Sequence, residues 1–243
     1  MKRRNPERIR TDISRELTSL FQVLNEDPSG VILNPGVLLS AANQVTRASS
    51  APFWSYQIAN LQLQVSSPQN VLPAACGNTL TICLDLDISG HCEDDETDCV
   101  TDLVLNLMIS SDTDHICTWH FDRHITDTAN STQQPQASEA HPLYHFQHGG
   151  NAMRPYADLL GNSLLLPAPR LAFPPLNAIL SLDFVLSNFH GACWNRLRED
   201  PTYLRLLQAS QKQHWKPYIE KLAKWWDLGP KDESCLALWP HLA

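Results

Sequence analysis

Histidine and aspartate alternate in the short segment 119–124, which contains His120, Asp122 and His124. In a β-strand successive side chains point to opposite faces, so these three residues would share one face of a sheet. Imidazole nitrogens and carboxylate oxygens bind zinc, and a zinc-bound water can be activated for hydrolysis. The segment therefore contains candidates for metal binding or for acid–base chemistry.

A second histidine-rich segment, HPLYHFQH, covers residues 141–148, where strand alternation would place His141 and His145 together. If the two strands pair, these imidazoles and Asp122 could converge at metal-ligand distance. The alternative is that some of ten histidines fall on strands without a metal, where they form buried hydrogen bonds or face solvent. The spacing matches no standard zinc motif. We therefore expect no cofactor, with zinc as the alternative.

Large apolar side chains are concentrated near the C-terminus. The set consists of Trp215, Trp225, Trp226, Leu236 and Trp239. One interpretation is that these residues cover the hydrophobic core. The other is a docking surface, because tryptophan is over-represented among the residues that anchor protein interfaces. They are our candidates for partner binding.

Helices are predicted at both ends of the chain. Asn5 and Pro6 are a cap and a first-turn proline, and apolar residues then recur every three or four positions, which predicts a helix over 6–25. A second helix is expected over 37–48. The C-terminal helices should span 175–227, with a buried apolar helix over 176–189 and a last helix kinked at Pro217. A tail covers 228–243.

Between the helices, residues 53–148 have the pattern of strands. Leu61, Leu63 and Val65 alternate with polar residues, and three further segments (79–88, 101–109 and 116–125) follow in order. Residues 126–140 form a polar loop, and 141–148 a fifth short strand. The predicted fold class is α+β, an antiparallel β-meander packed against an N-terminal helix and C-terminal helices. We expect residues 1–243 to form a single domain.

Composition restricts the class of partner and the compartment. The formal net charge is −8, so we do not expect nucleic acid as a direct ligand. We find no secretory signal and no apolar segment long enough to cross a membrane. Seven cysteines without a CxxC pair are typical of a reducing compartment. These features predict a cytoplasmic protein.

Two families resemble parts of the chain. The runs WHFDRH and HPLYHFQHGG, followed by a helix after Pro174 and Pro175, resemble small bacterial toxins of the TumE type over residues 100–190. That resemblance implies a bacterial toxin or antiviral defence setting. It would make His120, Asp122, His141 and His145 the residues to test. Long flanking helices distinguish this chain from such toxins.

The order of helix, meander, His-Pro, proline-rich connection and helix also resembles ubiquitin-conjugating and RWD-type domains. The segment 161–166, Pro174-Pro175 and 176–189 are similar to the region after the active-site strand of those enzymes. Where they have a catalytic cysteine, this chain has Leu164, Leu165 and Leu166. The resemblance therefore implies a non-catalytic binding relative.

Two functions follow from these features. The first is a non-catalytic, protein-binding accessory or assembly subunit of a cytosolic bacterial multiprotein system, such as an anti-phage defence system. It follows from the apolar C-terminal segment, the acidic charge and the absence of a known catalytic motif. The alternative is a histidine-centred, metal-dependent hydrolase or nuclease. We favour the non-catalytic function, with another protein subunit as partner.

Overall fold

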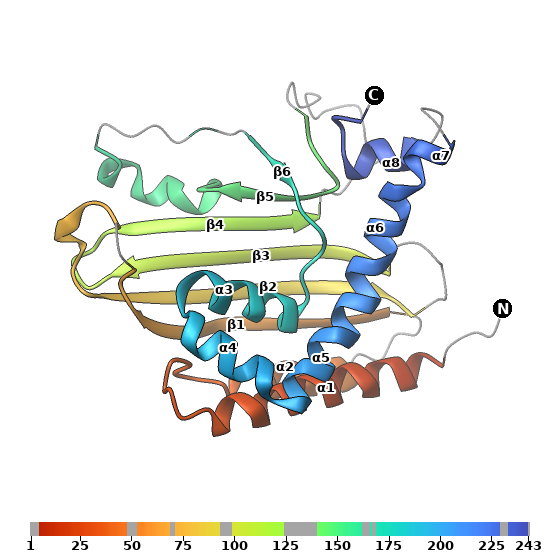
Figure 1. Cartoon of the computed structure of the whole chain (residues 1–243), viewed down its shortest axis with the longest axis horizontal. Coiled ribbons are helices and arrows are strands. Elements are labelled where there is room, and N and C mark those ends of the chain that lie inside the picture. Colours follow the sequence, from red (N-terminus) through yellow and green to blue (C-terminus); the bar gives the residue numbers. More distant parts are fainter. Residues whose placement is uncertain are drawn as a thin grey trace.

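An antiparallel sheet of six strands forms the centre of the molecule in our computed structural model (Figure 1). The structure describes residues 5–47, 53–68, 71–92, 99–123, 140–161, 166, 169–228 and 233–242. The strands are β1 (Phe53–Ser66), β2 (Thr79–His91), β3 (Val100–Ser111), β4 (Ile116–Arg123), β5 (Tyr144–His148) and β6 (Leu171–Ala172). They lie side by side in the order of the sequence. The predicted α+β fold with a β-meander is confirmed.

One face of the sheet is apolar and buried because side chains alternate along every long strand. Leu61 of β1 pairs with Leu84 of β2, which pairs with Leu107 of β3, and all three are buried. The opposite face contains polar and charged residues such as Gln57 and Asp87. The register of the sheet is therefore fixed by the burial of one face.

Helices cover the apolar face. In chain order they are α1 (Pro6–Glu26), α2 (Val37–Arg47), α3 (Ala178–Phe189), α4 (Gly191–Glu199), α5 (Pro201–Ser210), α6 (Lys216–Ala223), α7 (Trp225–Leu228) and α8 (Glu233–Leu238). Figure 1 shows α3 lying across the sheet, while α1 and α2 lie near β1. The helix α3 is apolar on most sides because it is packed between the sheet and the other helices.

The helix starts follow from local sequence. Asn5 accepts a hydrogen bond from the backbone of Glu7 at the start of α1, and Asn177 accepts one from Leu180 at the start of α3. Asp200 caps α5 in the same way, directly before Pro201. Near Pro217 the chain forms a π-helical turn, η3 (Gln211–Trp215), before α6 begins. This irregularity takes the place of the predicted kink, because proline has no N–H to donate.

The elements that were not predicted include the 3-10 helices η1 (Ala74–Cys76) and η2 (Asn151–Leu159) and three others. The two-residue strand β6 lies in the proline-rich connection, α4 precedes α5, and α8 lies inside the segment expected as a tail. Each is short and lacks a clear apolar period, so its existence depends on packing against the rest of the molecule. Among the described residues, no helix is both long enough and apolar enough to span a bilayer.

Candidate functional site

The two histidine-bearing segments are neighbours in the sheet. Strands β4 and β5 pair antiparallel, and in that register Asp122 lies opposite His145 while His120 lies opposite Gln147. Alternation places these side chains on the face away from α3, whereas Trp119 and Phe121 contact aromatic residues of the core. The predicted convergence of the two segments therefore occurs, on the polar face of the sheet.

The carboxylate of Asp122 lies between two imidazoles. Its Oδ2 is 2.7 Å from Nε2 of His120, and its Oδ1 is 2.9 Å from Nε2 of His145. The second ring nitrogen of His120, Nδ1, is 2.8 Å from the side-chain oxygen of Asn106 on β3. His120 is thus held at both ring nitrogens, and through it one oxygen of Asp122 is fixed in position.

The environment of Asp122 keeps its carboxyl group ionised. Burial alone would raise the pKa of Asp122, but the hydrogen bond from His120, the close approach of His145 and the coulombic attraction of both imidazoles outweigh burial. The pKa of Asp122 consequently lies well below its usual range. A negative charge is therefore maintained at the centre of the histidine cluster across the physiological pH range.

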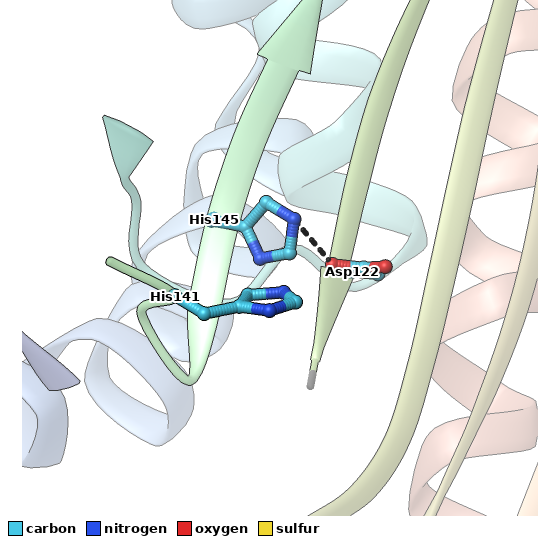
Figure 2. A group of neighbouring side chains, drawn as sticks. All are labelled: Asp122, His141 and His145. Carbon is cyan, nitrogen blue, oxygen red and sulfur yellow. Dashed lines mark ion pairs between the residues drawn. The ribbon is translucent and has the colours of Figure 1, made fainter. Parts of the chain in front are cut away.

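His141 completes the group from the segment before β5. Its ring centroid is 4.7 Å from that of His145, in an edge-to-face arrangement (Figure 2). One ligand atom each from Asp122, His141 and His145 can be chosen so that all three lie within 4.8 Å of one another. Two imidazoles with one carboxylate are a donor set that binds zinc or iron(II) in proteins.

The exposure of the cluster is uneven. His145 is 2% exposed, while the side chain of Asp122 is 26% exposed, so solvent reaches the group from the carboxylate side.

The segment that contains His141 is connected to the C-terminal helix α8, because the backbone N–H of Leu143 donates a hydrogen bond to the carbonyl of Ala237 at 2.7 Å. The predicted tail thus supports the strand that positions His145.

The aromatic residues of the C-terminal segment divide between interior and surface. Trp225 is 4% exposed, and Trp215 is partly buried and donates to the carbonyl of Pro175 at 3.0 Å. By contrast, Trp226 is 75% exposed and Trp239 is 42% exposed. Leu236 is half-buried in α8. The five candidates therefore do not share one environment.

Some predicted positions lie outside the described residues, namely His124, Leu164 and Leu165. Among the described ones, His120, Asp122, His141 and His145 come together as a single cluster. Asn106 was not singled out from the sequence. The sequence did carry a signal for it, because Asn106 is the one polar residue in the run 103–109.

Comparison with protein-family models, curated proteins and solved structures gives no match for this chain. The resemblances to TumE-type toxins and to RWD-type domains therefore stay predictions.

Proposed function

We propose that the chain is a non-catalytic, protein-binding subunit of a multiprotein assembly, and that its C-terminal segment contacts the partner. The observation that carries this proposal is the 75% exposure of Trp226 on α7. Ile219, on the adjacent α6, is also 56% exposed. Large apolar side chains gain free energy when a partner removes them from water, and tryptophan is a frequent anchor of interfaces.

The charges near these residues indicate the kind of partner. The chain as a whole has a net charge of −8, yet residues 211–228 contain four lysines and only two acidic residues, a local excess of two positive charges. Among them, Lys212, Lys216 and Lys224 are exposed. A protein that presents an apolar groove flanked by acidic residues would complement both features. We therefore propose a partner of this chemistry.

The state of the cysteines supports an assembly in a reducing compartment such as the cytoplasm. All seven cysteines lie in the described part of the chain without a disulfide bond, and four of them (Cys76, Cys92, Cys193 and Cys235) are buried. Disulfides are rare in the cytosol and common in secreted proteins. The stability of this fold therefore depends on its core rather than on covalent cross-links.

Co-expression with the products of neighbouring genes tests the proposal. A photo-crosslinking amino acid in place of Trp226 should form an adduct with one co-purified protein. Trp226→Ala should weaken binding to that protein by about 10-fold or more, because interface anchors typically contribute more than 1 kcal/mol. Charge reversal at Lys216 and Lys224 should weaken binding further at low salt.

A matched control is Leu33→Ala, since Leu33 is 49% exposed but lies between α1 and α2. This variant should bind the partner as the unchanged chain does. If Trp226→Ala and Leu33→Ala bind equally well, and no adduct forms at position 226, then the C-terminal segment is not the docking surface.

A second candidate function, a histidine-centred hydrolase, is favoured by the convergence of Asp122, His141 and His145. It predicts metal-dependent cleavage of a phosphodiester or a similar bond, lost in His145→Ala. This second function would be ruled out if His145→Ala cleaved as the unchanged chain does, or if the unchanged chain cleaved nothing in the presence of Zn²⁺, Mn²⁺ and Mg²⁺.

A further inference from the structure

We propose that Asp122, His141 and His145 bind one Zn²⁺ ion, with a fourth coordination position open to water. This inference is independent of the docking surface around Trp226, because the two sites share no residue. Three protein ligands with one open position are the arrangement found at catalytic zinc ions, whereas structural zinc sites have four protein ligands.

The spacing of the donor atoms suits such an ion. Zinc bonds to nitrogen and oxygen are about 2.0–2.2 Å long, so neighbouring donor atoms around a tetrahedral ion lie about 3.3 Å apart. Nε2 of His145 and Oδ1 of Asp122 are already 2.9 Å apart, and a donor set that includes His141 lies within 4.8 Å. Small side-chain rotations of His141 would close the site around an ion.

The geometry of the contact between Asp122 and His145 is the one expected for two side chains that bind the same metal ion. Although the two atoms are 2.9 Å apart, Oδ1 of Asp122 accepts no well-aligned hydrogen bond among the described residues. Two ligands of one metal direct their lone pairs at the ion rather than at each other. A short but misaligned contact between oxygen and nitrogen is therefore what a metal-ligand pair would show.

The other ring nitrogen of His145 is buried as well. This side chain is 2% exposed, and its Nδ1 has no hydrogen-bond partner among the described residues. In Figure 2 this nitrogen lies on the side of the ring that faces His141. A buried polar atom without a partner is destabilising, and such atoms in native proteins often mark the place of a water molecule or an ion. Because one imidazole binds one ion through a single nitrogen, the zinc ion would be held by Nε2 of His145, and a water molecule would satisfy Nδ1.

His120 acts as a positioning residue in this site. Through Nε2 it holds Oδ2 of Asp122, and through Nδ1 it contacts Asn106. Carboxylates that bind metals are commonly hydrogen-bonded on their other oxygen, which fixes their orientation. Oδ1 of Asp122 is thereby left for the ion.

Metal titration of the full-length protein tests the proposal. The chain is purified without a histidine tag, stripped with a chelator, and titrated with Zn²⁺ by calorimetry and with Co²⁺ by visible absorbance. We expect one ion per chain and the absorption bands of a four-coordinate cobalt centre with nitrogen and oxygen ligands. Asp122→Asn, His141→Ala and His145→Gln should each weaken binding by about 100-fold or more.

Two controls separate this site from other histidines. His148 is on the same strand as His145, and His115 directly precedes β4. Both His148→Ala and His115→Ala should bind zinc as the unchanged chain does. His120→Ala should weaken binding by about 10-fold, because Asp122 loses its support. If His145→Gln fails to fold, His141→Ala still provides the test, since His141 is only partly buried.

Two results would overturn the proposal. One is that the unchanged chain binds zinc no more tightly than His141→Ala does. The cluster would then be a hydrogen-bonded group without a metal. The other is one-to-one binding that persists in both Asp122→Asn and His141→Ala, which would place the ion elsewhere.

Discussion

Nε2 of His145 lies 2.9 Å from Oδ1 of Asp122 on the neighbouring strand, although the polar segment 126–140 separates the two residues in the sequence. The pairing of β4 with β5 creates this contact, and alternation along β4 places His120 beside Asp122. A cluster of one carboxylate and three imidazoles on the polar face of the sheet is the consequence. Its ionised aspartate makes it a suitable cation site.

The burial of His145 predicts a stability difference between two histidines of β5. His145→Ala should lower the free energy of unfolding by about 2 kcal/mol, because it leaves a cavity and removes the imidazole that lies against the carboxylate of Asp122. His148→Ala, at an exposed position of the same strand, should change it by less than about 0.5 kcal/mol. Urea denaturation in the presence of a chelator measures both. Equal losses would contradict the burial of His145.

The two adjacent tryptophans of α7 should also differ in how much each contributes to the stability of the fold. Trp225 is buried, so Trp225→Ala should cost about 3–5 kcal/mol of stability, or prevent folding. Trp226→Ala should leave the free energy of unfolding within about 0.5 kcal/mol of the unchanged chain. Thermal unfolding followed by circular dichroism tests this pair. A large loss of stability in Trp226→Ala would mean that its side chain packs inside the molecule.

We expect Asp183 to contribute strongly to the stability of the helical layer. This buried carboxylate of α3 accepts hydrogen bonds from Trp194, Arg198 and Tyr203, with the shortest, to Arg198, at 2.7 Å. Asp183→Ala should lower the free energy of unfolding by about 3 kcal/mol, because a charged and half-buried arginine loses its partner.

The control for Asp183 is Asp12→Ala. Asp12 pairs with Arg8 and Arg15 on the exposed side of α1, and surface ion pairs contribute less than about 1 kcal/mol. Chemical denaturation of both variants gives the comparison. If the two losses are similar, the network around Asp183 is not a major source of stability.

Glu16 predicts a pH dependence of stability. Burial, with a smaller contribution from Asp12, raises the pKa of Glu16 to about 7, whereas the unfolded chain has a value near 4.5. Between these values the folded state binds more protons than the unfolded state, so the contribution of Glu16 to stability falls as pH rises from 4.5 to 7. Glu16→Gln should therefore be more stable than the unchanged chain at pH 8, and this gain should shrink toward pH 5.

His214, which lines the same small cavity as Glu16, has the opposite influence. Burial lowers the pKa of His214 to about 4, so the unfolded state binds the additional proton between pH 6.5 and 4 and stability falls as pH falls. Because both chains contain His214, the difference between Glu16→Gln and the unchanged chain isolates Glu16. A difference that does not vary between pH 5 and pH 8 would contradict the raised pKa.

Strand alternation was sufficient to predict much of the candidate site. The faces of β4 follow from a two-residue period, which is why His120 and Asp122 were assigned to one face and Trp119 to the other. The partner of a strand, however, is not encoded in its own period. Only the register in the folded sheet placed Asp122 opposite His145 and Asn106 beside His120.

The C-terminal tryptophans show the limit of sequence patterns most clearly. Composition indicated a concentration of apolar area in this segment, but Trp225 and Trp226 are adjacent and have the same side chain, so no local pattern separates them. Their burial depends on how the short helix α7 follows α6 and on the packing of α8 against α6.

The sequence alone determined the class of fold, the alternation within strands and the helix start at Asn5, because these depend on periodicity and on local hydrogen bonds. The tertiary structure alone decided which imidazole meets which carboxylate and which indole remains in water. Those outcomes depend on contacts between segments distant in the chain, whose free energies arise only when the whole core is assembled.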